Sequence, residues 1–249
     1  MSIKNENFEK YMLEYIDSLY AKYADDLSNA YRFSSICYEN SDLEAQFGVY
    51  EADLLFLLAK DAAPNKIVEI SPCGGYSSTF LYQATRNGQT YESFDIHDRS
   101  QANLPESVRK VRNFHLGDVR NHKFDEQIDF LLMDSDHSYE FCDWYVENVF
   151  PAVSENSWIF VNDIFDHDGG WYHEKFPFCG TIQSSPNGRE GTKLVQFLES
   201  KNVEEFFNIQ KNSEKLLNMR RKHNVIDLPA NIPQVLWTLS SSVIFRKSW

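Results

Sequence analysis

The sequence has few cysteines, little positive charge and no long apolar run. Its four cysteines form no CxxC pair and show no spacing typical of a structural zinc site, which favours a reducing compartment. Residues 1–10 are polar and lack the apolar stretch of a signal peptide, and the longest apolar runs elsewhere are interrupted by charge. We therefore expect a cytoplasmic protein that does not enter a membrane.

Positive charge is scarce, because 24 lysines and arginines face 37 aspartates and glutamates, which gives a formal net charge of −13. Such a chain repels a nucleic-acid backbone at long range unless one face gathers the basic residues. The two basic clusters, at 109–112 and 211–222, have the polar spacing of solvated helix faces. We expect no nucleic-acid partner, and a small molecule or a protein as substrate.

The first part of the chain has helical periodicity. Apolar residues recur at helical spacing over 8–27, which predicts an amphipathic helix. Its apolar face either covers the core or forms the seam of a homodimer. A polar connector over 34–42 and a second helix ending near Pro64 should follow.

The period then changes to that of an α/β protein. Short apolar runs that alternate with helix-like segments lie at 66–70, 91–96, 111–116, 128–133 and 158–161. This alternation predicts a mostly parallel sheet with helices on both faces. Two later apolar runs, at 203–209 and 235–245, predict a closing pair of strands and bring the sheet to seven.

The loop after the first of these strands is the strongest candidate for a ligand site. The segment 67–78, IVEISPCGGYSS, runs from a buried-type strand through small residues into a helix start. In an α/β sheet a ligand binds at this place, because the next helix leaves its first backbone amides free. Gly74 and Gly75 let the backbone approach a ligand closely. A plain strand-to-helix turn would look the same.

Acidic residues follow the next two strands. Asp95 ends the second strand, where a carboxylate can accept both hydroxyls of a ribose, although an exposed strand-end acid is the alternative. The Gly117–Asp118 turn after the third strand would let Asp118 reach an adenine amino group, unless it is only a turn.

The fourth strand ends in 134–140, DSDHSYE, which places two carboxylates and an imidazole at the edge of the sheet. These groups can bind a divalent cation or act as a general base, or Asp136 can simply cap the next helix. Asn162 and Asp163 reach the same edge from the fifth strand. With Asp134 they would form an oxygen-ligand set, unless Asp163 only caps a helix or forms a salt bridge.

With these elements in this order, the chain resembles class I S-adenosylmethionine-dependent methyltransferases. Within them it is most similar to the small-molecule O-methyltransferases that act on macrolide and aminocoumarin sugars. The resemblance covers about 47–165 and is carried by 47–51 (FGVYE), 133–140 (MDSDHSYE) and Asn162-Asp163. It implies a Rossmann-like domain over 47–249, with an antiparallel closing strand, preceded by a helical extension over 1–46.

The resemblance also implies roles for single residues. The loop 71–75 would hold the methionine part of S-adenosylmethionine, Asp95 the ribose, and Gly117-Asp118 the adenine. The full set of implied cofactor contacts is Glu69, Ser71, Pro72, Cys73, Gly74, Gly75, Tyr76, Ser77, Asp95, Ile96, Gly117, Asp118 and Asp134. In metal-dependent members the residues at Asp134, Asn162 and Asp163 bind magnesium, and Asp136 removes the hydroxyl proton, with His137 as the alternative base.

The chain departs from the family at two places. Ser71 and Cys73 stand at the first two of the three alternating glycines, and Asn162 stands where sugar-modifying members often have an acid. The connection 163–190, rich in acids, histidines and aromatics, should line the substrate site or pack over the sheet edge.

Three other functions compete with O-methylation of a small molecule. A nicotinamide-dependent oxidoreductase lacks support because the loop has no GxGxxG and the acids after the fourth strand would be unused. A methyltransferase fold kept as a binding or scaffold module is compatible with the altered glycine loop. A nucleic-acid methyltransferase is disfavoured by the acidic charge and by the lack of an Asn-Pro-Pro-Tyr-like motif.

Overall fold

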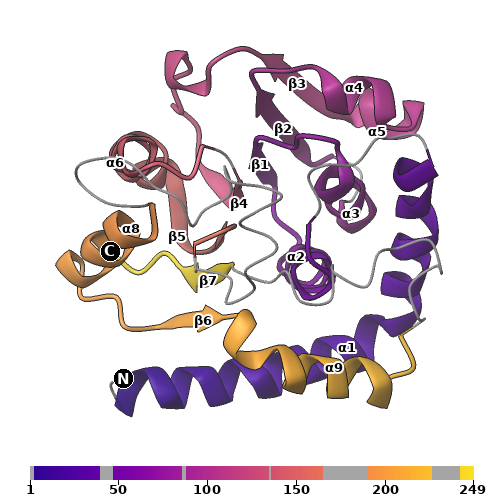
Figure 1. Ribbon diagram of the computed structural model, residues 1–249, viewed down its shortest axis with the longest axis vertical. Coiled ribbons are helices and arrows are strands. Elements are labelled where there is room, and N and C mark those ends of the chain that lie inside the picture. The colour runs from indigo at the N-terminus through magenta and orange to yellow at the C-terminus, as the bar shows by residue number, and fades with distance from the viewer. Residues whose placement is uncertain (1–2, 40–46, 86–87, 135, 165–189, 226–241) are drawn as a thin grey trace, which may run out of the picture.

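Seven strands form one sheet in the order β3-β2-β1-β4-β5-β7-β6 (Figure 1). The computed structural model describes residues 3–39, 47–85, 88–134, 136–164, 190–225 and 242–249. The strands are β1 (Lys66–Ile70), β2 (Thr90–Asp95), β3 (Arg112–Leu116), β4 (Ile128–Met133), β5 (Val153–Val161), β6 (Phe206–Asn208) and β7 (Val243–Arg246). The α-helices are α1 (Ile3–Glu39), α2 (Val49–Ala62), α3 (Tyr76–Ala84), α4 (Arg99–Asn103), α5 (Glu106–Val111), α6 (Tyr139–Asn148), α8 (Glu190–Ser200) and α9 (Ser213–Lys222).

The predicted topology is confirmed. Strands β1 to β5 pair in parallel, whereas β7 runs antiparallel to both of its neighbours. Two hydrophobic clusters lie on opposite faces of the sheet, one formed with α1, α2 and α3 and the other with α6 and α8. This is a Rossmann-like fold, and it brings the carboxyl ends of β1, β2, β4 and β5 to one edge.

Strand boundaries follow burial. The central strands β1 and β4 occupy the predicted residues, because burial on both faces makes them continuous apolar runs. Strand β5 begins at Val153, earlier than the predicted 158, because its first half is exposed and polar and so carries no apolar pattern. Of the predicted last strand, residues 235–241 lie outside the described residues, and β7 covers the rest.

The first helix is longer than predicted. Residues 34–39 belong to α1, with a kink at Tyr23, and do not form the expected polar connector. The Ser34 hydroxyl donates to the Ala30 carbonyl at 2.8 Å and lies 2.6 Å from the Thr79 hydroxyl. A serine whose hydroxyl donates to the carbonyl four residues earlier is compatible with a helix. The polarity of this segment therefore predicted the end of the helix too early.

The apolar face of α1 packs inside the chain. Met12, Ile16 and Leu19 are buried in the cluster that α2 and the sheet also form. At the same interface, buried Asp53 on α2 forms an ion pair with Arg220 on α9. These contacts support a covering role for α1, whereas a homodimer through this helix and the domain division at residue 46 stay predictions. None of the described helices combines the length and the apolar character needed to span a membrane.

Candidate cofactor pocket and acidic cluster

The loop after β1 keeps a glycine-like backbone without the family's glycines. Ser71 has φ of 65° and Cys73 has φ of 48°, both in the left-handed region, and Gly75 follows with φ of 90°. The Ser71 amide donates to the Phe94 carbonyl at 2.7 Å, which extends the β1–β2 ladder by one bond. The loop therefore turns as a glycine-rich loop would, at a cost of about 1–2 kcal/mol for each left-handed non-glycine residue.

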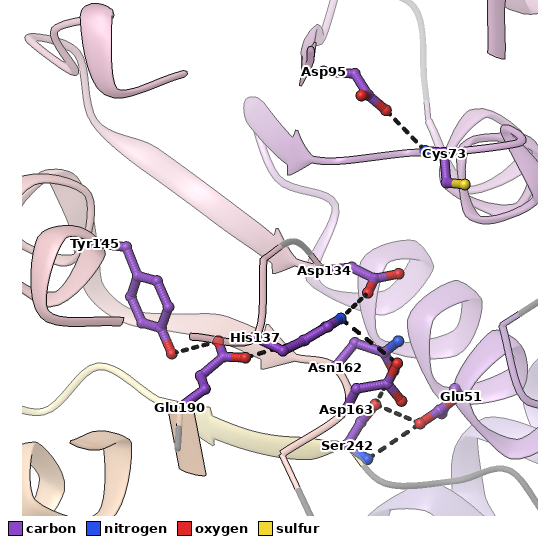
Figure 2. Close-up of polar contacts among 10 residues, drawn as sticks. All are labelled: Glu51, Cys73, Asp95, Asp134, His137, Tyr145, Asn162, Asp163, Glu190 and Ser242. Carbon is purple, nitrogen blue, oxygen red and sulfur yellow. Dashed lines mark hydrogen bonds and ion pairs between the residues drawn. The ribbon is translucent and has the colours of Figure 1, made fainter. Parts of the chain in front are cut away.

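Asp95, at the end of β2, is hydrogen-bonded to this loop (Figure 2). One carboxylate oxygen accepts the backbone N–H of Cys73 at 3.0 Å, and the other accepts that of His97 at 2.9 Å. The side chain is nearly buried, with 7% of the residue exposed. A carboxylate oxygen has two lone pairs, so Asp95 can hold both amides and still accept hydrogen bonds from a ribose.

A pocket of about 360 Å³ opens where these strands end. This volume lies within the range of small-molecule sites. Among the residues expected to contact the cofactor, those that line the pocket are Ser71, Cys73, Asp95, Ile96, Gly117 and Asp118. Asp136, expected to be catalytic, lines it as well. The strand ends thus bring together residues that are far apart in the sequence.

Asp118 is held by a neighbour at the rim of the pocket. Its oxygens accept the backbone N–H of Arg120 at 2.9 Å and three guanidinium hydrogen bonds, the shortest from Nη2 at 2.7 Å. The hydrogen bonds from Arg120 hold the pKa of Asp118 below its ordinary value. The side chain is therefore an ionised acceptor where an adenine amino group is expected.

Other predicted cofactor contacts lie beneath or beside the pocket. Glu69 is fully buried and accepts hydrogen bonds from the hydroxyls of Ser77 (2.6 Å) and Ser78 (2.7 Å) and from Tyr91. It fixes the start of α3 instead of lining the pocket. Tyr76 packs in the hydrophobic cluster. The turn backbone is formed by Pro72, Gly74 and Gly75, where the Gly75 amide donates to the Pro72 carbonyl at 2.7 Å.

Beside the pocket, Asp134, His137 and Asp163 form an acidic cluster around one imidazole (Figure 2). The Nε2 atom of His137 lies 3.7 Å from a carboxylate oxygen of Asp134 and 3.7 Å from one of Asp163. Two of the three residues have left-handed backbones, with φ of 50° at His137 and 53° at Asp163. Such strain at two strand-end positions is typical of functional sites.

The imidazole is held from its other side by residues that sequence reasoning missed. Its Nδ1 atom lies 3.0 Å from Oε2 of Glu190, and the Tyr145 hydroxyl donates to Oε1 of Glu190 at 2.9 Å. Burial disfavours the charged imidazole, but Glu190 and the two aspartates outweigh it and raise the pKa of His137 to about 10. This shift favours the protonated imidazole at neutral pH while the site holds no cation. The role of His137 as the alternative base stays a prediction.

Another buried acid, Glu51, lies close to the acidic cluster. Glu51 accepts the backbone N–H groups of Gly48 at 2.8 Å and Ser242 at 3.1 Å. The Ser242 hydroxyl makes short contacts with both Glu51 and Oδ1 of Asn162. Because this hydroxyl has one proton, both contacts are hydrogen bonds only if Glu51 is protonated. Burial, together with the charge of Asp163, raises the pKa of Glu51 to about 8, which agrees with that state.

The donor set fits a divalent cation and contains two of the three predicted magnesium ligands, Asp134 and Asp163. Single ligand atoms of Asp134, His137 and Asp163 all lie within 4.8 Å of one another. Asn162 belongs to the predicted magnesium set, yet its amide oxygen faces the Ser242 hydroxyl and its side chain also hydrogen-bonds Asp134. Two carboxylates suit magnesium, whereas an imidazole nitrogen in place of an amide oxygen also suits transition metals.

Residues 68–164 match a family model described as a methyltransferase domain. The match covers β1 to β5, and so it contains both the pocket and the acidic cluster. The match spans less than half of the 249-residue chain, and it shows that this part of the chain is similar to methyltransferase domains.

Similar solved structures are also methyltransferases. The O-methyltransferase TomG from Streptomyces achromogenes, involved in tomaymycin synthesis and solved with S-adenosylmethionine, is 19% identical, with a TM-score of 0.45 over 80% of this chain and 86% of TomG. The methyltransferase PaMTH1 from Podospora anserina, solved with S-adenosylhomocysteine, is 14% identical, with a TM-score of 0.48 over 90% and 88% of the two chains. No curated protein sequence matches this one.

Proposed function

We propose that the protein transfers a methyl group from S-adenosylmethionine to a hydroxyl oxygen of a small molecule. The observation that carries the proposal is the position of the pocket formed by Ser71, Cys73, Asp95 and Asp118, beside a cluster of acids around His137. S-adenosylmethionine, when bound, supplies an electrophilic methyl group. The chain's own residues then have to orient the acceptor and remove its proton.

Two carboxylates are candidates for the proton acceptor. Asp136 is exposed, lines the pocket and accepts the Ser138 hydroxyl at 2.8 Å, and it stays our first proposal for the base. Asp134 is the alternative, because burial and the neighbouring Asp163 raise its pKa to about 7. A base whose pKa lies near the working pH is efficient in proton transfer. Without a bound cation, the protonated His137 would place a positive charge beside Asp134.

We also propose that the activity is assisted by a divalent cation, with Asp134, Asp163 and His137 as the residues that would hold it. His137 would bind the cation as the neutral imidazole, so the cation would take the place of its second proton. A bound cation lowers the pKa of a hydroxyl that it contacts. Magnesium is the cation that the resemblance implies. The proposed location in the cytoplasm rests on cysteine usage, on the polar residues 1–10 and on the charges that interrupt the apolar runs.

A turnover assay tests the proposal. The purified chain is incubated with S-adenosylmethionine, with and without magnesium, and with a panel of catechols, phenols and sugars, and both the methylated product and S-adenosylhomocysteine are measured by mass spectrometry. Turnover with a hydroxyl compound, lost in Asp134→Asn or Asp136→Asn but kept in the exposed control Asp125→Asn, is the expected result. Undiminished turnover in Asp136→Asn would remove that residue from the role of base.

A thermal shift separates the remaining alternatives. S-adenosylhomocysteine should raise the melting temperature and NAD should not, since only a ligand of the folded state stabilises it. A shift by NAD alone would favour an oxidoreductase. If millimolar S-adenosylhomocysteine does not change the melting temperature, the result would favour a binding or scaffold protein that holds no cofactor.

A further inference from the structure

A second pocket, of about 480 Å³, lies between the start of α1 and the β5–β7 ladder. The residues that matter for its chemistry are Phe8, Tyr11, Asn156, Glu205 and Arg246. None of the residues that line it also lines the cofactor pocket. Figure 1 shows the N-terminal part of α1 running beside β6, away from the carboxyl ends of β1 and β2.

The pocket is too far from the acidic cluster to hold a methyl acceptor. Arg246 is paired with Trp158 in the ladder, and Trp158 precedes Asn162 by four residues along β5. At a rise of about 3.3 Å per residue, this separation is roughly 13 Å along the strand. A ligand bound at Arg246 therefore belongs to a site of its own.

Arg246 has no carboxylate partner among the described residues. Its Nε atom is buried and has no hydrogen-bond partner, and no ion pair of Arg246 occurs in the part of the chain that the structure describes. The guanidinium carbon lies 4.1 Å from the centroid of the Trp158 ring. Stacking on a ring satisfies the face of a guanidinium and leaves the Nη N–H groups in its plane available to an anion, whereas the buried Nε is out of reach of a ligand.

Aromatic rings continue from this cation along α1. Tyr15 stacks on Trp158 with centroids 6.3 Å apart, and Tyr11 stacks on Tyr15 at 6.1 Å. Tyr11 is 52% exposed, which is unusual for a large ring, and Phe8 lies 6.4 Å from it. The pocket thus offers a guanidinium together with flat apolar surface that nothing among the described residues covers.

We propose that this pocket binds a small aromatic carboxylate. A carboxylate matches the planar fork of the Arg246 guanidinium with two parallel hydrogen bonds. The ring of the ligand would lie on Tyr11 and Phe8, and Asn156 would provide a further polar contact. A single negative charge fits better than a phosphate dianion, because Glu205 lines the pocket and the chain has a net charge of −13.

The test is calorimetric titration of the full chain, saturated with S-adenosylhomocysteine, with benzoate, benzamide and inorganic phosphate. Saturable benzoate binding, with benzamide bound about tenfold more weakly or worse, is expected because benzamide cannot form the charged pair. Arg246→Gln should weaken benzoate binding by about tenfold or more, and the exposed control Arg109→Gln should leave it unchanged. Tyr11→Ala, at a half-exposed position, should weaken it severalfold without affecting the fold.

Several results would overturn the proposal. The first is that benzoate shows no saturable binding at millimolar concentration. The second is that benzoate and benzamide bind equally well, and the third is that Tyr11→Ala leaves benzoate binding unchanged. Phosphate that binds as tightly as benzoate and displaces it would show a general anion site instead. All these variants should bind S-adenosylhomocysteine as the wild type does. A negative result for the second pocket would therefore leave the proposed methyltransferase function unaffected.

Discussion

Replacement of Asp95 by asparagine should weaken binding of S-adenosylhomocysteine by about 10-fold to 100-fold. The two carboxylate oxygens of Asp95 accept backbone N–H groups of Cys73 at 3.0 Å and His97 at 2.9 Å. Each oxygen keeps a lone pair for a ribose hydroxyl, whereas an asparagine offers one acceptor oxygen for all four donors. Losing one hydrogen bond to a charged acceptor costs about 1.5–3 kcal/mol, and each 1.4 kcal/mol is about tenfold in affinity.

The measurement is calorimetric titration of wild type and Asp95→Asn with S-adenosylhomocysteine at the same salt concentration. Asp125→Asn, an exposed carboxylate outside the pocket lining, is the matched control for the charge change. Circular dichroism establishes that the variant is folded. An unchanged dissociation constant in folded Asp95→Asn would refute the assignment of the ribose to this residue.

Three further outcomes follow from the buried residues. Gly75→Ala should lower the free energy of unfolding, measured by urea titration, by about 1 kcal/mol more than Gly88→Ala does. Both glycines have a φ near 90°, but only at Gly75 would the added Cβ meet a side chain, that of Leu104 at 2.8 Å. Glu51→Gln should remove part of the pH dependence of the free energy of unfolding. The pKa of Glu51 is about 8 in the folded protein and about 4.5 in the unfolded chain, so the stability that its neutral carboxyl contributes is lost as the pH rises from 4.5 to 8. If wild type and variant differ equally at about pH 5 and pH 8.5, the pKa of Glu51 is not raised. Asp53→Asn should cost about 3–5 kcal/mol by leaving Arg220 buried without its ion pair, and loss of less than about 1 kcal/mol would contradict that.

The sheet could be predicted from the sequence because its central strands are buried on both faces. Such strands are continuous apolar runs, and β1 and β4 have the predicted bounds. The order of acids after the strands then placed Asp95 and Asp118 at one pocket, since parallel strands end at one edge. The end of α1 was misplaced, because Ser34 is polar yet bonded within the helix.

The acidic cluster was predictable only in part. Asp134, His137 and Asp163 lie within four residues of the ends of β4 and β5, and all three were identified as candidates from the sequence. Their grouping depends on left-handed backbones at His137 and Asp163, which neither composition nor spacing encodes. Glu190 reaches the cluster from a helix far along the chain and belongs to no motif. Glu51 belongs to the segment FGVYE, but that segment does not indicate a contact with residues after the fifth strand.

A crystal structure of the chain with S-adenosylhomocysteine tests the central claim most directly. The account predicts that the ribose hydroxyls bind the carboxylate of Asp95, that the adenine lies between Ile96 and Gly117, and that the sulfur lies on the side of Asp134. Density for the ligand elsewhere on the molecule, or a ribose that makes no contact with Asp95, would contradict it.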